Sequence, residues 1–101
     1  MRIVHISPNS PYNDYWGYQD NLLPKYHRIL GHEVAIITTN TMHKDGKIVE
    51  TECNDYVLDD GVRVIRLKKK QYPHIVLTNL MSYMPVYDYL KAYKPDFVFF
   101  H

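Results

Sequence analysis

The sequence predicts an α/β protein with a doubly wound, mostly parallel sheet. Short apolar runs recur along the chain, at residues 3–6 (apart from His5), 34–37 and 97–100, and the last two runs are apolar on both faces. Such runs are typical of parallel strands that helices cover on each side. Segments with apolar residues at helical spacing separate these runs. This alternation of strands and helices favours a parallel sheet between two helical layers.

Length and composition indicate one small globular domain. The chain has 101 residues, of which 46% are hydrophobic, so it can build a core. It carries 12 Lys and Arg against 11 Asp and Glu, so no global field attracts nucleic acid, and we expect no nucleic-acid partner. The single cysteine fits a reducing compartment. The apolar start is too short for a signal peptide or a membrane span, so we expect a cytoplasmic protein.

The first strand and the first helix follow from the N-terminal residues. The run at 3–6 ends in Ser7-Pro8-Asn9-Ser10-Pro11, because the prolines lack donors and Asn and Ser favour turns. A loop continues to about Gly17, and a helix follows it. Pro24 is harmless if Asp20 or Asn21 caps this helix, and kinks it if the helix begins at Gly17. Its apolar face consists of Leu22, Leu23, Tyr26, Ile29 and Leu30.

The middle of the chain predicts a second strand and a hairpin. Gly31 suits the left-handed position that ends the helix, and the strand at 34–37 follows. We expect a polar excursion over residues 41–55. Residues 56–58 and 62–67 should pair as a hairpin, because Asp59-Asp60-Gly61 between apolar runs is a type I′ turn signal. The arm at 62–67 would also be the third parallel strand.

The C-terminal third predicts two helical segments and a last strand. Apolar residues recur at helical spacing over 75–84, and Pro85 suits the first position of a second helix that ends near Lys94-Pro95-Asp96. Residues 97–100 form the fourth parallel strand. Right-handed crossovers then give the strand order 3-2-1-4, a Rossmann-like sheet with a β-hairpin insertion.

The chain stops at His101, one residue past a core strand. A fourth strand without cover would expose a long apolar edge, which is a template for pairing with another chain. We therefore interpret residues 1–101 as a partial N-terminal Rossmann-like domain of a larger protein. We also expect the fragment to self-associate.

The loop between the first strand and the first helix is the predicted ligand site. Open α/β sheets bind ligands at the carboxyl ends of their strands, and a helix N-terminus favours an anion such as a phosphate. The residues expected to contact substrate or phosphate are Ser7, Pro8, Trp16, Gly17 and Tyr18. Neither G-x-G-x-x-G nor a P-loop motif is present. An ordinary turn glycine at position 17 therefore remains the alternative.

Six histidines offer no metal site, because none has a zinc-ligand spacing to another histidine or to the cysteine. We expect neither a metal nor a cofactor. His32 follows the end of the first helix, where its ring can bond the last carbonyls. His101 lies at the carboxyl end of the fourth strand, on the same edge as the Ser7 loop. It is the candidate catalytic residue.

The one basic cluster is Lys68-Lys69-Lys70, with Arg63 and Arg66 upstream. A solvated loop explains it, and contact with anionic lipid head groups or a nucleic-acid backbone is the alternative. Ten tyrosines make the chain rich in aromatic residues. They either fill the core with their hydroxyls at the surface, or form a surface on which sugars or bases stack.

Five segments, in the same order, resemble the start of the N-terminal domain of GT-B fold retaining glycosyltransferases of family 4 (glycosyl transferase group 1). In this family two adjacent glycines usually stand in the loop, whereas here Tyr18 follows Gly17. The segments are Met1-Arg2-Ile3-Val4-His5-Ile6, the Pro-rich loop ending in Gly17-Tyr18, Leu30-Gly31-His32-Glu33-Val34, Asp60-Gly61-Val62-Arg63-Val64 and Lys94-Pro95-Asp96-Phe97-Val98-Phe99-Phe100-His101.

The resemblance implies a two-domain enzyme of the hexosyltransferase type that moves a sugar from a nucleotide-sugar donor to a glycan or lipid-linked acceptor. It implies no bound metal. The N-terminal domain would shape the acceptor side and an absent C-terminal domain would hold most of the donor, so residues 1–101 alone should be inactive. Relatives often build bacterial surface polysaccharides at the inner membrane face, where Lys68, Lys69 and Lys70 would give peripheral contact. The alternative is a non-catalytic flavodoxin-like module that binds a nucleotide or a protein.

Overall fold

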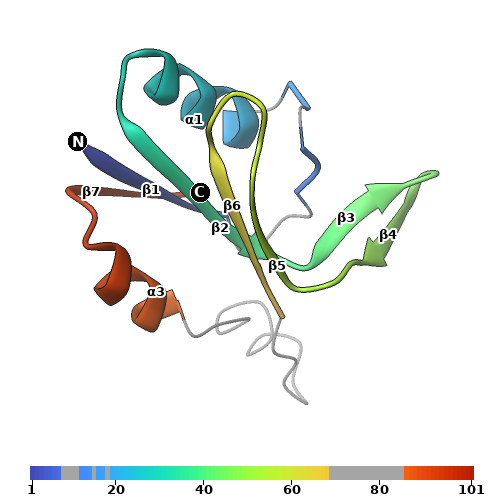
Figure 1. The fold of residues 1–101 in the computed structure, drawn as a ribbon. Helices are drawn as coiled ribbons and strands as arrows, with labels where there is room; N and C mark the ends of the chain where they lie inside the picture. Colours follow the sequence, from blue (N-terminus) through green and yellow to red (C-terminus); the bar gives the residue numbers. More distant parts are fainter. Residues whose placement is uncertain (8–11, 15, 18, 69–85) are drawn as a thin grey trace.

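The described residues form a five-stranded sheet that has a helix on each face, together with a separate two-stranded hairpin (Figure 1). The structure is a computed structural model that describes residues 1–7, 12–14, 16–17, 19–68 and 86–101. The predicted α/β class is confirmed. In chain order the elements are β1 (Arg2–Ser7), α1 (Gln19–Ile29), β2 (Glu33–Thr39), β3 (Thr41–Lys44), β4 (Lys47–Glu50), β5 (Asn54–Val57), β6 (Arg63–Leu67), α3 (Val86–Tyr93) and β7 (Phe97–Phe100).

The five-stranded sheet has the order β5-β6-β2-β1-β7 and is mostly parallel. β1 pairs in parallel with β2 and β7, and β2 pairs in parallel with β6. β5 is antiparallel to β6, so the sheet is mixed. Because β1, β2 and β7 run in one direction, their carboxyl ends bring Ser7, Thr39 and His101 to one edge, which the sequence predicted for His101 and the Ser7 loop.

Alternating strand residues build one core layer on each face of the sheet. α3 covers one layer and α1 lies against the opposite face, where His27 and Arg28 approach the strands (Figure 1). The layer under α3 contains Val4, Ile6, Ala35, Ile37, Ile65 and Leu67. The layer on the other face contains Ile3, Tyr12, Val34, Ile36, Val62 and Val64.

The ends of α1 differ in how closely they follow the prediction. The helix begins at Gln19, so Pro24 lies inside it and removes one helical hydrogen bond, which is closer to the predicted start at Gly17 than to a cap at Asp20 or Asn21. At the other end Gly31 adopts φ +93°, as predicted. The amides of Gly31 and His32 donate to the carbonyls of Arg28 and His27, at 3.0 and 3.2 Å, which satisfies the last turn.

Two hairpins are present where the sequence predicted one. The polar excursion over residues 41–55 leaves the main sheet as expected, but within it β3 and β4 pair around Asp45 and Gly46, a hairpin that the sequence analysis did not predict. Both turn residues have positive φ, 53° and 74°, as a type I′ turn requires. The β5–β6 hairpin is confirmed, but its turn is not type I′, because only Gly61 has positive φ there.

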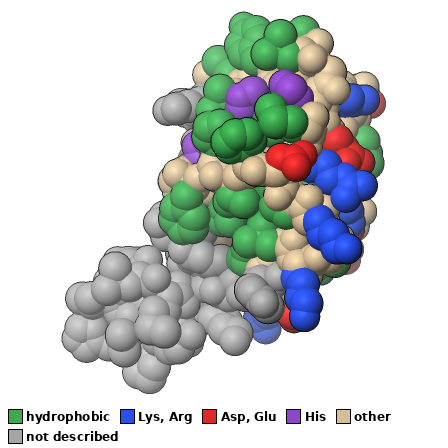
Figure 2. Space-filling view, turned by 90° about the vertical axis from the view of Figure 1, so that its left-hand side faces the viewer, with side chains coloured by type: hydrophobic (Ala, Val, Ile, Leu, Met, Phe, Trp, Pro, Cys, Tyr) green, Lys and Arg blue, Asp and Glu red, His purple; other side chains and the backbone are tan. Residues whose placement is uncertain are grey.

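β7 is a strand as predicted, but it is not covered on both faces. It pairs with β1 at the edge of the sheet, and the exposed fractions of its four side chains lie between 37% and 67%. Figure 2 shows this side of the molecule, where hydrophobic side chains surround histidines. The predicted helix over 75–84 lies outside the described residues.

Candidate functional site

A cavity of about 280 Å³ lies between the start of α1 and the turn that joins β5 to β6. Two of the predicted site residues, Trp16 and Gly17, line it. Gly17 leaves open space, because no atom lies within 4 Å of the place where a Cβ would stand. The other lining residues are Tyr12, Asn21, Leu22, Lys25, Leu58, Asp59 and Asp60.

The Trp16 indole also contacts the β3–β4 hairpin. It stacks on the ring of His43, with centroids 5.5 Å apart and planes at 9°. A second hollow of about 270 Å³ borders this stack and is lined by Trp16, His43 and the turn residues of the hairpin. Sequence reasoning missed this role of the hairpin, although Asp45-Gly46 was a turn signal that could have revealed it.

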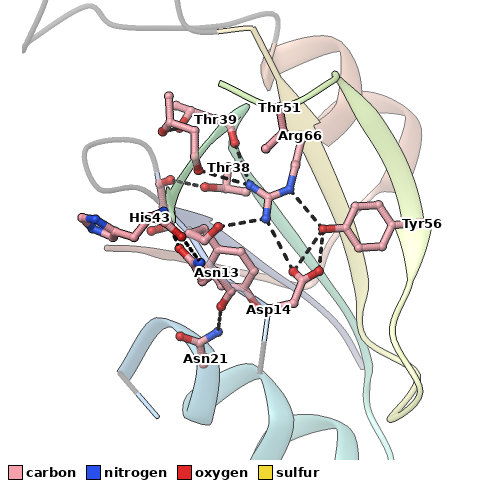
Figure 3. A network of polar contacts seen from close by, with 12 residues as sticks. Asn13, Asp14, Asn21, Thr38, Thr39, His43, Thr51, Tyr56 and Arg66 are labelled. Atoms are coloured by element: carbon pink, nitrogen blue, oxygen red, sulfur yellow. Dashed lines mark hydrogen bonds and ion pairs between the residues drawn. The ribbon is translucent and has the colours of Figure 1, made fainter. Parts of the chain in front are cut away.

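Arg66 anchors the loop that carries Trp16 (Figure 3). Its side chain is buried, and it donates to the carbonyls of Thr39, Thr41 and Tyr12 at 3.3, 3.3 and 2.8 Å. Its Nε donates to the Tyr56 hydroxyl at 3.0 Å. An ion pair of 3.6 Å with the Asp14 carboxylate completes the set. Four hydrogen bonds and one ion pair therefore hold the buried guanidinium inside the fold, which disfavours a role for Arg66 in binding a phosphate.

Asn13 and Tyr56 extend this anchoring network around residues 12–14. The Asn13 side chain and the backbone of His43 exchange two hydrogen bonds, of 2.8 and 2.7 Å. The Asn21 amide donates to the Asn13 carbonyl at 2.7 Å, which ties α1 to the same loop. The Tyr56 hydroxyl donates to the Asp14 carboxylate, and burial raises the pKa of Tyr56. The loop before Trp16 is therefore fixed to β3, β5, β6 and α1.

The two arginines of the predicted basic cluster are engaged in contacts within the fold. Arg66 is buried, and Arg63 pairs with Asp55, whose pKa the Arg63 hydrogen bond lowers (Nε to Oδ1, 2.8 Å). Lys68 is exposed, while Lys69 and Lys70 lie outside the described residues. Contact with a membrane through the three lysines stays a prediction.

The remaining predicted contacts fall in different places. Ser7 is the buried last residue of β1, and its carbonyl accepts a hydrogen bond from Thr38 Oγ1 at 2.8 Å. Pro8 and Tyr18 lie outside the described residues. The cavity beside Trp16 is lined by the carboxylates of Asp59 and Asp60 and one lysine. Such a lining suits hydroxyl groups better than a phosphate, because like charges repel.

His101 belongs to a line of three hydrogen-bonded imidazoles. Its Nε2 lies 2.9 Å from His5 Nδ1, and His5 Nε2 lies 3.0 Å from His27 Nδ1. Burial, followed by the neighbouring His101 and His27, lowers the pKa of His5 from 6.5 to about 3. Burial and then His32 lower the pKa of His27. The rings of His5 and His27 are therefore neutral at physiological pH.

The imidazoles bond to one another instead of converging on a point. Among the residues that the structure describes, no group of His, Cys, Asp or Glu side chains is arranged to hold a metal ion. The predicted imidazole-to-carbonyl bond of His32 is replaced by a contact of its Nδ1 with the N-terminal amine of Met1, at 3.2 Å.

No helix in the described part of the chain combines the length and the apolarity needed to cross a bilayer. Comparisons of the chain with protein-family models, with curated proteins and with solved structures found no match.

Proposed function

We propose that this chain is the acceptor-side domain of a GT-B glycosyltransferase and that the cavity beside Trp16 holds part of a glycan acceptor. The sheet supports this proposal, since its four parallel strands lie in the order β6-β2-β1-β7 between helices, which suits a doubly wound Rossmann-like domain. The five segments that resemble family 4 support it from the sequence.

The lining of the cavity carries the proposal. An indole offers an apolar face against which the C–H groups of a sugar ring pack. The carboxylates of Asp59 and Asp60 can accept hydrogen bonds from hydroxyls on the ring edge. A cavity of about 280 Å³ is of a size for one or two sugar units. Apolar faces with a few polar groups are typical of specific small-molecule sites.

The proposal assigns the donor to a second domain. On the family resemblance the nucleotide sugar would bind mainly outside residues 1–101, and transfer would occur where His101 and the Ser7 loop share the carboxyl edge of the sheet. The acceptor would be a glycan or a lipid-linked glycan of a bacterial surface polysaccharide, handled in the cytoplasm at the inner membrane face. We expect purified residues 1–101 to transfer no sugar.

Fluorescence of the single tryptophan tests the proposed acceptor cavity directly. Methyl glycosides of common hexoses and N-acetylhexosamines would be titrated into the purified chain at neutral pH. We expect a saturable change in Trp16 emission, because a bound ring displaces water from the indole. Asp59→Asn should weaken binding, since it removes a carboxylate from the lining.

Asp88→Asn is the matched control, because it makes the same change on α3, across the sheet from the cavity. It should leave the titration unchanged. A response to free nucleotides and none to glycosides would replace the proposal by the flavodoxin-like binding module. No response to any glycoside, with the fold intact by circular dichroism, would overturn the assignment of the cavity.

A further inference from the structure

Three imidazoles from distant parts of the chain form one continuous line through the protein. His5 lies in the middle of β1 with no exposed surface. His101 follows β7 at the carboxyl edge of the sheet, and His27 lies in the last turn of α1. The two links measure 2.9 and 3.0 Å, which is within normal hydrogen-bond range. The line therefore runs from the strand ends, through the core, to the surface of α1.

The hydrogen bonds couple the protonation of the three rings. A neutral imidazole has one N–H donor and one acceptor nitrogen. Both nitrogens of His5 are bonded, so if His5 Nδ1 accepts from His101, then His5 Nε2 must donate to His27. If one bond reverses, the other must reverse as well. The tautomer of His101 is thus set by that of His27 through His5.

We propose that this line transfers protons between the carboxyl edge of the sheet and the surface of α1. His101 Nδ1 takes a proton from water or from a hydroxylated ligand, whose oxygen keeps the bonding electron pair. The proton on His101 Nε2 passes to His5 Nδ1, and the proton on His5 Nε2 passes to His27 Nδ1. His27 then releases its Nε2 proton to solvent. One proton has crossed, and each ring is again neutral in the opposite tautomer.

The surroundings of His5 favour concerted transfer over storage of charge. Phe99 of β7 stacks on its ring, with centroids 5.0 Å apart and planes at 13°. On β2 the register partner of His5 is Ile36. Among the described residues, the titratable groups that face His5 are His27 from α1 and His101 from the end of β7, while His32 meets the edge of His27. A lasting positive charge on His5 is disfavoured because its ring is buried.

The proposal goes beyond glycosyl transfer, since it depends only on the three rings. Nitrogen-15 NMR of the histidine rings in the intact chain tests it without a substrate. In the unmodified protein we expect His5 to show one donor and one acceptor nitrogen, and its buried ring proton to exchange with water. In His27→Phe, which fills the volume without a nitrogen, we expect a changed tautomer signature at His101 and loss of the water-exchange signal of His5.

His32→Phe is the matched control, because His32 also touches the His27 ring but has no hydrogen bond within the line. It should leave His101 unchanged. A second variant, His27→Asp, places a carboxylate that only accepts, and should hold His101 as the Nε2–H tautomer. If His101 keeps its ring signals and His5 keeps its water exchange in both His27 variants, with native circular dichroism, the line does not transfer protons and the proposal is wrong.

Discussion

Acid should destabilise this protein through His5. Its pKa is about 3 in the folded chain, against 6.5 for an unperturbed imidazole, because its ring is buried. Between these two values the unfolded chain binds a proton at this position and the folded chain does not. The contribution of His5 to stability is therefore complete above about pH 6.5. It decreases as the pH falls toward 3.

The expected loss is large for a small domain. Each pH unit below the ordinary pKa costs about 1.4 kcal/mol of folding free energy per group. At about pH 4.5, two units down, His5 alone should therefore cost about 2.7 kcal/mol. Domains of this size are stable by only about 5–15 kcal/mol. A substantial part of the stability should disappear before most carboxylates are protonated.

Urea unfolding at several pH values measures this effect, and His5→Phe isolates it. Phenylalanine keeps a ring against Phe99 but cannot take up a proton. The rings of His101 and His27 are both partly exposed, so water can replace their bonds to His5. From about pH 6 to pH 4, the unfolding free energy of the unmodified chain should fall by about 1.4 kcal/mol per pH unit more than that of His5→Phe.

Other groups, such as Asp55 with its lowered pKa, also contribute less to stability in acid, but this loss is the same in both proteins. Parallel curves of unfolding free energy against pH would refute the reasoning. They would mean that His5 is charged in the folded protein, or that its ring is solvated.

Three further predictions concern burial and the exposed edge. Arg66→Met should cost about 3 kcal/mol or more, because the Asp14 carboxylate loses its ion-pair partner and the carbonyls of Tyr12, Thr39 and Thr41 lose the guanidinium donor; urea unfolding would show it, and a loss below 1 kcal/mol would contradict it. Tyr93→Phe should stabilise the chain by about 1 kcal/mol, because its buried hydroxyl has no hydrogen-bond partner among the described residues; a lower melting temperature would argue against this. The chain should form dimers or larger species in light scattering at tens of micromolar, and Phe100→Lys should shift it to monomer, because a charge on an open strand edge opposes pairing. A monomeric unmodified chain would show that the edge does not associate.

Local patterns in the sequence determined most of the elements. The run Val34-Ala35-Ile36-Ile37 is apolar on both faces, and β2 is indeed buried on both faces. Gly31 predicted the end of α1, because a residue without Cβ meets little resistance in the left-handed conformation that closes the last turn. The Asp-Gly signal at positions 45 and 46 was equally local and would have predicted the β3–β4 hairpin.

The roles of Arg66 and His5 were decided only by the tertiary structure. Arg66 stands two residues before three lysines, and this segment has the composition of a solvated basic cluster. It is buried because carbonyls from residues 12, 39 and 41 meet at its guanidinium. His5, His27 and His101 have no common spacing, and only the parallel register of β1 and β7 and the seating of α1 align their rings. The spacing of residues indicates which face of a segment is buried and which local backbone conformation it adopts. Contacts between residues from distant segments form only when the strands of the sheet have paired.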